Sequence, residues 1–429
     1  MYNHLSAAPT PPMGFNTWDC YGAAVNEEQF LNMARVQRDR LLPYGWEYAV
    51  IDIQWFEPTA DSGNYHPFAE LTMDGYSRLL PAENRFPSAK GGKGFKPIAD
   101  EIHAMGMKFG IHILRGIPRQ AVHRNTPTVT PGVTARDIAS PYSVCPWNTD
   151  MYGVNPDARG AQEYYDSLFQ LYAAWGVDFV KVDDIANTEF KPHDPYSARR
   201  EIEMIAKAIE RCGRPMALSL SPGPAPLFAG SHLQRHANMW RMSGDFWDTP
   251  EALDRMFDLC EKWYPFVGEG HWPDCDMIPL GVLQINEPQK KYRARKCRLT
   301  PAEQQTLIDL WCVFRSPLIF GGELTRLDEE TLRLLTNREL LAINQRSTGN
   351  RPLIAERDRH VWTCRDGEGR TVYAAFNRGD EPLVFDFDAE EDAPFLTKDL
   401  WTGETKKQKT RRIVVSLGPK ESKVLRVER

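Results

Sequence analysis

Short apolar runs alternate over the first 345 residues with longer stretches of helical spacing. The intervening stretches, among them EEQFLNMARVQRDRLLPYG and SARREIEMIAKAIERCG, predict amphipathic helices. Repeated βα units predict a (β/α)₈ TIM barrel over residues 1–345, with its active site at the C-terminal ends of the strands. The runs that predict its strands are GFNTW, YAVIDIQW, KFGIHIL, DFVKVDD, MALSLSP, WRMSGD, HWPDCDM and SPLIFGG, with HWPDCDM the weakest because it contains proline and no β-branched residue.

The pattern changes after Gln345, where short alternating runs such as HVWTCRD and TVYAAFN are separated by Gly, Asp and Glu. It predicts a small antiparallel β-sandwich over residues 346–429, so the fold class is α/β with a C-terminal β domain. This region contains no catalytic cluster, which indicates a supporting role. The segment from Arg115 to Asn155 is long and rich in Pro and Thr, and we expect it to form a loop over the barrel mouth.

Two of the predicted strands carry a carboxylate toward the C-terminal end, Asp183 in DFVKVDD and Asp245 in WRMSGD. Residues two apart on a strand share a face, so Lys181 accompanies Asp183, while Arg241 and Ser243 accompany Asp245. The two acids could be a catalytic pair. Each could equally form a salt bridge with its own cation, and the strand pattern alone favours the salt bridges.

Composition narrows the class of partner. The chain has 429 residues, 42% hydrophobic and 26% charged, which is typical of a globular protein. A net charge of -6 with dispersed Lys and Arg disfavours nucleic acid. Twelve Trp and fifteen Tyr fit stacking against sugar rings, although they fit a large aromatic core equally well.

The cysteines and the first residues bear on the compartment. The eight cysteines include no C-x-x-C pair, so the pattern indicates neither a zinc site nor a disulfide framework, and we expect free thiols. The first fifteen residues contain no apolar core of signal-peptide type, and no apolar stretch is as long as a membrane span. A cytoplasmic protein without a membrane partner is the expectation.

Several motifs occur in an order that resembles glycoside hydrolase family 27, the α-galactosidase family, over nearly the whole chain: PPMGFNTW, IDIQW, KFGIHI, KVDDI, WRMSGD, PDCDM, SPLIFGGEL and LLAINQ. The resemblance implies a barrel joined to a C-terminal antiparallel domain, which the apolar pattern predicts independently. It also implies a retaining mechanism, in which Asp183 is the nucleophile and Asp245 is the general acid/base. Neither a metal nor an organic cofactor is implied.

The resemblance extends to residues of the sugar pocket. It implies that Trp18 is a wall of the pocket, Asp52 a ligand for a sugar hydroxyl, and Asp276 a contact near the leaving group. Each has a simpler alternative: Trp18 in the core, Asp52 in a local hydrogen bond, and Asp276 as a solvated loop acid.

The two cations affect the acids differently. Lys181 would favour the ionised form of Asp183 and could bind a sugar hydroxyl. Asp245 must be protonated before each turnover, and Arg241 would lower its pKa. Arg241 is therefore also a candidate for binding the sugar or the nucleophile.

One departure from the family pattern bears on the sugar. Ile53 follows Asp52 where the α-galactosidases have adjacent aspartates. Isoleucine accepts no hydrogen bond, and its branched side chain fills the room that a hydroxymethyl group needs. β-L-Arabinopyranose has the ring stereochemistry of α-D-galactopyranose without that group, and the family's β-L-arabinopyranosidases resemble this chain here. Alternatively, Ile53 points into the barrel wall, because strict alternation places it opposite Asp52.

Further departures concern Ser221, His112 and Ile185. Ser221 replaces the glutamate that binds the 2-hydroxyl in α-galactosidases, and the family's α-N-acetylgalactosaminidases have serine there. His112 replaces a pocket tyrosine. Ile185 replaces a cysteine of the usual disulfide beside the nucleophile, which agrees with a cytoplasmic chain.

The sequence thus predicts a retaining exo-glycosidase that releases a terminal β-L-arabinopyranosyl or α-D-galactopyranosyl residue. The alternatives are an α-N-acetylgalactosaminidase and, in a different class, a sugar-binding protein on a catalytically inactive barrel. A glycoside is the expected partner, and a homo-oligomer is compatible with the sequence.

Overall fold

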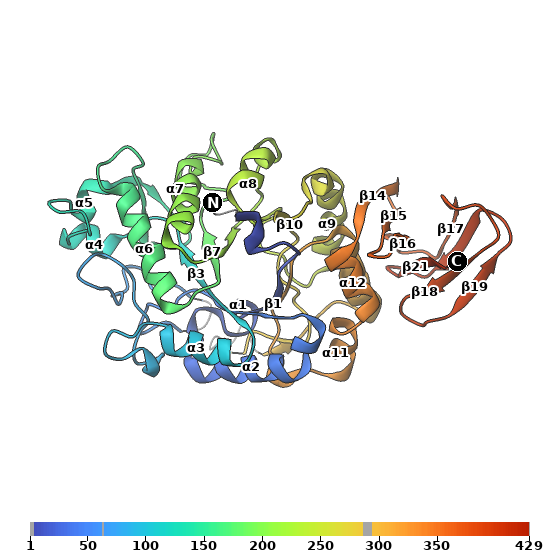
Figure 1. Ribbon diagram of the computed structural model, residues 1–429, viewed down its shortest axis with the longest axis horizontal. Coiled ribbons are helices and arrows are strands. Elements are labelled where there is room, and N and C mark those ends of the chain that lie inside the picture. The colour runs from blue at the N-terminus through green and yellow to red at the C-terminus, as the bar shows by residue number, and fades with distance from the viewer. Residues whose placement is uncertain (1–3, 62–63, 286–293, 429) are drawn as a thin grey trace.

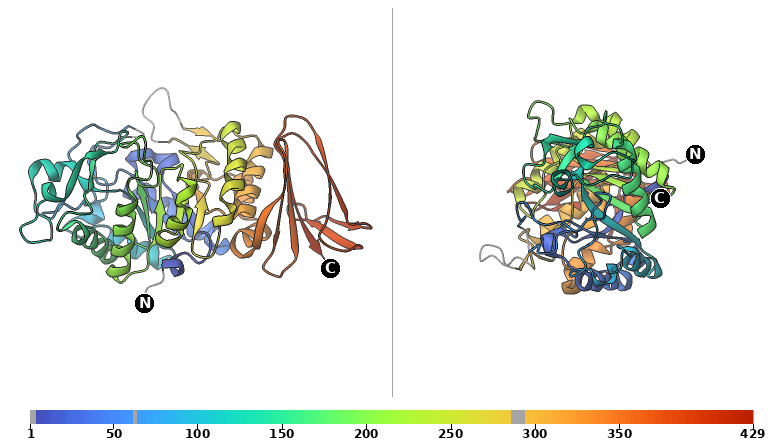
Figure 2. Two further views of the ribbon diagram at one scale, coloured as in Figure 1. Left: turned by 90° about the horizontal axis from the view of Figure 1, so that it is seen from above. Right: turned by 90° about the vertical axis from the view of Figure 1, so that its left-hand side faces the viewer.

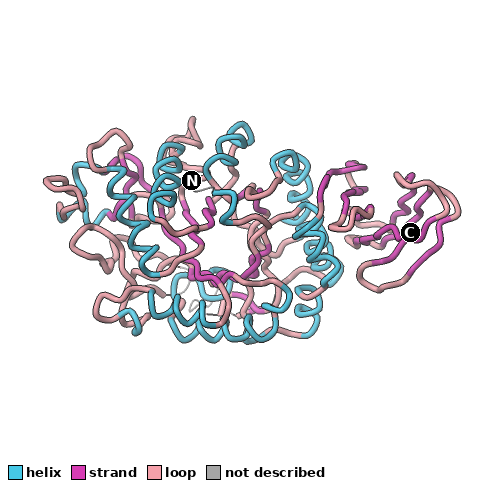
Figure 3. Tube along the Cα trace, viewed as in Figure 1, coloured by secondary structure: helices cyan, strands magenta, loops and turns pink. Residues whose placement is uncertain are grey.

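A closed sheet of parallel strands forms the centre of the larger part of the molecule, as Figures 1 and 3 show. The computed structural model describes residues 4–61, 64–285 and 294–428. The eight strands lie in the order β10-β9-β8-β7-β3-β2-β1-β13. Their bounds are β1 (Met13–Asn16), β2 (Tyr48–Ile51), β3 (Lys108–Leu114), β7 (Phe179–Asp183), β8 (Ala217–Leu220), β9 (Met239–Arg241), β10 (Trp272–Asp274) and β13 (Leu318–Phe320).

Each of the eight predicted strand runs overlaps one strand of this sheet, and the predicted barrel fold is confirmed. An isolated parallel bridge joins Ile278, four residues after β10, to Phe320 of β13. HWPDCDM forms β10 despite Pro273. Along its length β10 pairs only with β9, so the N–H that proline lacks is not needed for a second neighbouring strand.

Helices surround the strands (Figure 3), and their ends carry the expected signals. Thr300 caps α10 in a capping box with Glu303, and Gly176, at φ +87°, ends α6. Among the described residues, no helix combines the length and the apolar character needed to cross a membrane. The helices are α1 (Trp18–Tyr21), α2 (Glu27–Arg40), α3 (Lys96–Ala104), α4 (Arg119–Arg124), α5 (Ala135–Ile138), α6 (Ala161–Trp175), α7 (Arg199–Cys212), α8 (Gly230–His236), α9 (Pro250–Trp263), α10 (Pro301–Phe314), α11 (Glu329–Leu335) and α12 (Arg338–Arg346).

The segment from Arg115 to Asn155 is not the plain loop that its composition predicts. It contains α4, α5 and a small sheet of β4 (Ile117–Pro118), β6 (Met151–Val154) and β5 (Ala139–Val144). A buried ion pair of 3.0 Å between Arg115 and Glu201 ties its start to α7. Most of its Pro and Thr residues lie between these short elements, although Pro118 and Pro141 lie in β4 and β5, so the composition predicted the turns but not the strands.

Antiparallel sheets follow at one end of the barrel, as Figure 2 shows. A two-stranded sheet packs on a six-stranded sheet of order β14-β15-β16-β21-β18-β19, which confirms the predicted sandwich architecture. Of these strands, β14, β18 and β19 were not predicted from the sequence. The bounds are β14 (Thr348–Ala355), β15 (Arg359–Arg365), β16 (Thr371–Asn377), β17 (Leu383–Asp388), β18 (Phe395–Asp399), β19 (Thr405–Gln408), β20 (Arg412–Leu417) and β21 (Ser422–Glu428).

The central strands of the larger sheet, β15, β16 and β21, are largely buried on both faces. One face joins Val361, Tyr373 and Val427 in a core with β17 and β20. The other face packs on barrel helices: the Trp362 ring meets those of Tyr264 and Phe314 edge-on, at centroid distances of 6.2 and 6.1 Å. This shared core supports a structural role for the C-terminal strands. The division of the chain at residues 345 and 346 remains a prediction.

A buried carboxylate on α10 also joins the two parts. Asp309 accepts hydrogen bonds from Trp401 Nε1 at 2.8 Å and from the Ser422 hydroxyl at 2.6 Å. We expect Asp309→Ala to lower the free energy of unfolding in urea by about 1–3 kcal/mol, because two donors lose their acceptor. The control is Asp100→Ala, which removes an exposed carboxylate on α3 and is expected to change little. Equal losses in the two variants would contradict this account.

Candidate active site

A cavity of about 340 Å³ opens where the barrel strands end. This volume lies within the range of small-molecule sites. Its lining residues are located at or after the C-terminal ends of β1, β2, β7, β8, β9 and β10, or come from the long connections beyond them. They are Trp18, Asp52, Ile53, Tyr65, Trp147, Lys181, Asp183, Glu189, Pro222, Gly223, Arg241, Gly244, Asp245 and Met277.

Asp183 ends β7 and is held by three side chains. Its Oδ2 lies 2.7 Å from His112 Nε2 and 3.7 Å from Lys181 Nζ, and the Ser221 hydroxyl donates to Oδ1. Burial would raise the pKa of Asp183, but the Lys181 ammonium and the hydrogen bonds from His112 and Ser221 hold it well below its usual range. The carboxylate is therefore ionised, and both of its oxygens are oriented.

Lys181 lies between two carboxylates. Its Nζ is 2.9 Å from Oδ2 of Asp52 and 3.7 Å from Oδ2 of Asp183. Burial opposes the charge, yet these carboxylates raise the pKa of Lys181 above its usual range. Asp52 also accepts a hydrogen bond of 2.6 Å from Asn16, and despite burial its pKa is lowered by Lys181 and His112. One cation thus favours the ionised form of both acids.

Asp245 lies on the loop after β9, which corrects the prediction that Arg241, Ser243 and Asp245 share a strand face. Strand β9 ends at Arg241. The Ser243 hydroxyl donates to the Gly244 carbonyl at 2.7 Å, and such local side-chain bonds compete with strand pairing. The Asp245 side chain is 60% exposed and lines the cavity, so its carboxyl group is solvated whereas that of Asp183 is enclosed.

Arg241 joins Asp245 to a second acid. Its Nη2 lies 2.7 Å from Oδ2 of Asp276 and 3.3 Å from Oδ1 of Asp245. Burial raises the pKa of Asp276 to about 7, although Arg241 opposes the shift, and the carboxylates of Asp245 and Asp274 add to it. The guanidinium is therefore shared, and its shorter contact is with Asp276 rather than with Asp245.

The residues expected in the pocket divide into two groups. Seven of them line the cavity: Trp18, Asp52, Ile53, Lys181, Asp183, Arg241 and Asp245. The other three, His112, Ser221 and Asp276, are 0%, 0% and 4% exposed and lie behind it. His112 and Ser221 contact Asp183 directly, so the structure places them as supports of that carboxylate. Asp276 is no solvated loop acid, because it is buried against Arg241.

Ile53 lines the cavity directly after Asp52, although it also belongs to the buried core. Strand β2 ends at Ile51, so strict alternation does not apply to Asp52 and Ile53. The alternation argument for the barrel-wall alternative is therefore lost, while an exposure of 1% keeps Ile53 a core residue as well.

Two aromatic residues of the cavity were missed from the sequence. The Trp18 and Tyr65 rings stack at 6.0 Å with an angle of 15° between their planes, and Trp147 lies 5.8 Å from Tyr65. Tyr65 and Trp147 come from long connections without a motif, so only the general abundance of aromatic residues pointed to them. Glu189, Pro222, Gly223, Gly244 and Met277 also line the cavity and were missed; Gly244 and Met277 lie in the motifs WRMSGD and PDCDM, but neither side chain carries a group that would mark it as functional.

Metal-ligating side chains gather elsewhere in the molecule. Among the described residues, the group of His, Cys, Asp and Glu side chains that could share a metal ion consists of Glu203, His232 and His236. None of the three lines the cavity.

Comparison with known proteins agrees with this geometry. Residues 156–346 match the family model of Alpha galactosidase A, and residues 356–427 match that of the Alpha galactosidase C-terminal beta sandwich domain. The crystal structure of a β-L-arabinopyranosidase of glycoside hydrolase family 27 from Geobacillus stearothermophilus has a TM-score of 0.96 and 52% identity, over 99% of this chain and 98% of that one.

Two further relatives carry other names. A candidate α-N-acetylgalactosaminidase from Bacillus halodurans C-125 has a TM-score of 0.87 and 48% identity, over 97% of each chain. Alpha-galactosidase A from Cellvibrio japonicus is 26% identical over 93% of this chain and 87% of its own length. A barrel with a carboxylate-lined cavity and these relatives defines a glycosidase. The chain belongs to glycoside hydrolase family 27.

The Arg241–Asp276 ion pair of the site is deeply enclosed on both sides, since its side chains are 3% and 4% exposed. We expect Asp276→Ala to lower the free energy of unfolding by about 3–5 kcal/mol, because it leaves a buried guanidinium short of its main partner. Urea unfolding measures the loss. Glu101→Ala, which breaks the exposed Arg35–Glu101 pair, is the control and is expected to cost little. A similar small loss in both variants would contradict the assignment.

Proposed function

We propose that this glycosidase hydrolyses its substrate by double displacement with retention of configuration, with Asp183 as nucleophile and Asp245 as general acid/base. The observation that carries the proposal is the contrast between the two carboxyl groups. Asp183 is enclosed by Lys181, His112 and Ser221, which favour its ionised form. Asp245 is 60% exposed on the same cavity, where it can exchange protons with water.

In the first step an oxygen of Asp183 attacks the anomeric carbon, and the bond from that carbon to the leaving oxygen breaks. Asp245 gives its proton to the leaving oxygen, so the aglycone departs as a neutral alcohol. In the second step the Asp245 carboxylate takes a proton from water, the water oxygen attacks the same carbon, and Asp183 leaves as a carboxylate. Inversion at each step gives overall retention.

The neighbours of Asp183 support this role. Each carboxylate oxygen has two lone pairs, so the hydrogen bonds from His112 and Ser221 still leave electrons for attack. These donors fix the orientation of the Asp183 carboxylate, so less orientational entropy is lost when it attacks the anomeric carbon. Lys181 and Asp52 line the cavity and present a cation and an acceptor for sugar hydroxyls.

Azide rescue tests the two roles separately. Asp183→Gly and Asp245→Ala are each expected to lower kcat by about 10⁴-fold on a substrate with a poor leaving group. Azide should then give Asp245→Ala a glycosyl azide of retained configuration and Asp183→Gly one of inverted configuration, as NMR of the products would show. Asp157→Asn, an exposed acid outside the cavity, is the control and should keep full activity. The opposite pairing of configurations would reject the assignment.

For the sugar we propose a terminal β-L-arabinopyranosyl residue in preference to α-D-galactopyranosyl. Ile53 lines the cavity beside Asp52 and is 1% exposed, so its side chain occupies space that a hydroxymethyl group would need. The Geobacillus relative, described as a β-L-arabinopyranosidase, supports the same sugar, and a variant of that enzyme has been solved in complex with arabinose.

A second candidate is an α-N-acetylgalactosaminidase. It is supported by Ser221 and by the 48% identical candidate enzyme of that name. Ser221 is fully buried and donates to Asp183, however, so its hydroxyl is engaged at the nucleophile. Hydrolysis of the three p-nitrophenyl glycosides ranks the candidates, and we expect the arabinopyranoside to have the highest kcat/KM.

Ile53→Asp should shift this specificity. The shorter side chain opens space and the new carboxylate accepts a hydrogen bond, so the ratio of kcat/KM for α-galactoside over β-L-arabinopyranoside should rise by about tenfold or more. Ile51→Val, which shortens a buried residue of β2 outside the cavity, should leave the ratio unchanged. A wild-type preference for the galactoside, or an unchanged ratio in Ile53→Asp, would refute the role of Ile53.

We also propose that the protein works in the reducing cytoplasm. All eight cysteines lie within the described residues and each is free, and Ile185 stands in place of the cysteine beside the nucleophile. The only partner this account requires is the glycoside. A homo-oligomer remains compatible, whereas nucleic acid and membrane are not expected.

A further inference from the structure

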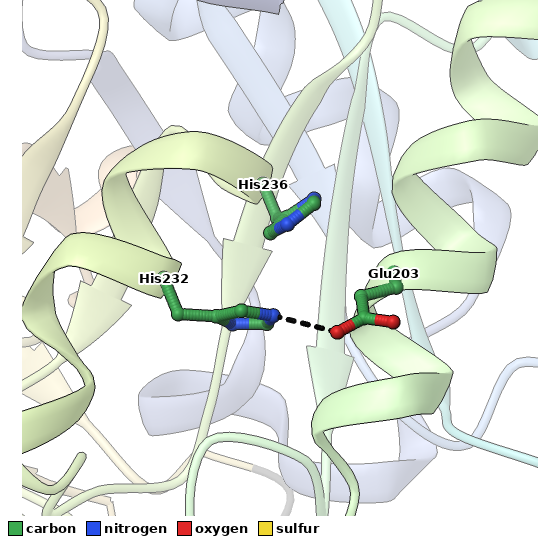
Figure 4. Close-up of side chains that lie close together, drawn as sticks. All are labelled: Glu203, His232 and His236. Carbon is green, nitrogen blue, oxygen red and sulfur yellow. Dashed lines mark hydrogen bonds and ion pairs between the residues drawn. The ribbon is translucent and has the colours of Figure 1, made fainter.

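Three ligating side chains converge on the outside of the barrel, between helices α7 and α8, as Figure 4 shows. His232 and His236 are four residues apart on α8 and therefore lie on one face of it, one turn apart. Their ring centroids are 4.4 Å apart. Glu203 projects toward them from α7, and the ligating atoms of the three residues all lie within 4.8 Å of one another.

A neighbouring hydroxyl orients the first histidine. His232 Nδ1 lies 2.8 Å from the Tyr196 hydroxyl, and Nε2 lies 3.0 Å from Oε1 of Glu203. Tyr196 is 5% exposed, so it is a fixed anchor for the ring. A metal-binding histidine commonly makes such a bond through its second nitrogen, which sets the ring orientation and leaves the first nitrogen for the ion.

The second histidine has its lone pair available. Among the described residues, no hydrogen bond or ion pair is made by the His236 side chain, although His232 lies against it. A neutral imidazole is the form that coordinates a metal.

We propose that Glu203, His232 and His236 bind a divalent transition-metal ion, and that this ion links α7 to α8. Two imidazole nitrogens and one carboxylate oxygen suit Zn²⁺, Co²⁺ or Ni²⁺ better than Mg²⁺ or Ca²⁺, which prefer oxygen ligands. Water would complete the coordination, since the Glu203 side chain is 46% exposed and the site is open to solvent.

The ligands need only a small movement to close on an ion. With metal–ligand bonds of about 2.0–2.1 Å, donor atoms around a tetrahedral ion lie roughly 3.3 Å apart. The contact between His232 and Glu203 is already 3.0 Å. The side chains of Glu203 and His236 are not enclosed, so rotation about their side-chain bonds can supply the rest.

This site is structural rather than catalytic, because none of its ligands lines the cavity. Helix α7 follows β7, which ends at Asp183, and α8 follows β8, after which Ser221 comes. An ion between the two helices stabilises the wall of the barrel behind these residues. It binds the folded state alone, so it should raise Tm and leave kcat unchanged.

Zn²⁺ binding to metal-free protein, measured by competition with a chromogenic chelator, tests the proposal. Wild type should bind one ion per chain at this site and gain a few degrees in Tm. His236→Ala and Glu203→Gln should each weaken that binding by roughly tenfold or more and lose the Tm gain, with kcat unchanged. His123→Ala, which removes a histidine of α4 far along the chain, is the matched control and should behave as wild type.

The eight free cysteines are the other potential ligands, so Co²⁺ is used as a spectroscopic probe. The Co²⁺ protein should show ligand-field absorption without thiolate-to-cobalt charge-transfer bands, and His236→Ala should lose it. The proposal is overturned if wild type binds no Zn²⁺ in large excess, if His236→Ala and Glu203→Gln bind as wild type does, or if the Co²⁺ spectrum shows thiolate ligands.

Discussion

The register of three neighbouring strands is the constraint on which the site depends. Parallel pairing sets His112 of β3 opposite Lys181 of β7, and Lys181 opposite Ser219 of β8. Asp183 is two residues farther along β7, opposite Leu114, and its carboxylate contacts His112 on one neighbouring strand and Ser221 just after the other. A shift of one residue in either pair would turn these side chains to the opposite face of the sheet.

The same register places charged side chains close together at a buried position, where burial alone would favour their neutral forms. An isolated buried carboxylate tends to be protonated, yet Lys181, two residues before Asp183 on one face, favours its ionised form and that of Asp52. Arg241 contacts both Asp245 and Asp276, and its contact with Asp276 is the shorter of the two. Asp245 is thereby left at the open side of the cavity, so the two carboxyl groups differ in environment.

Much of the fold could be predicted from the sequence, because barrel strands buried on both faces appear as apolar runs. The exceptions have local causes. Short strands between Pro and Thr were hidden in the segment from Arg115 to Asn155. Strands β14 and β19 are largely exposed, so their apolar pattern is weak, and β18 carries polar residues, Thr397 and Asp399, at buried positions. Strand β9 is shorter than WRMSGD suggested, and the Ser243 hydroxyl bonds the carbonyl of the next residue, Gly244.

Site residues that lie in a sequence motif could be predicted. Residues that only the fold brings to the cavity could not. Asp183, Asp245 and Asp52 stand in recognisable segments, whereas Tyr65 and Trp147 reach the cavity from connections without a pattern. His112 and Ser221 were expected to touch the sugar, but burial places them behind Asp183. The two histidines on α8 belong to no metal-binding motif in the sequence, since their partner Glu203 lies on another helix.

Asp183 is proposed to form the covalent intermediate, and trapping of that intermediate identifies the nucleophile. The reagent is a 2-deoxy-2-fluoro glycosyl fluoride of the preferred sugar. The fluorine at C2 slows both chemical steps, and the good fluoride leaving group offsets this in the first step alone. The glycosyl-enzyme therefore accumulates. Mass spectrometry of the digested protein should then find one added sugar per chain, on the peptide that contains Asp183. Label on Asp245 or on another residue, or turnover with inversion and no adduct, would contradict the account.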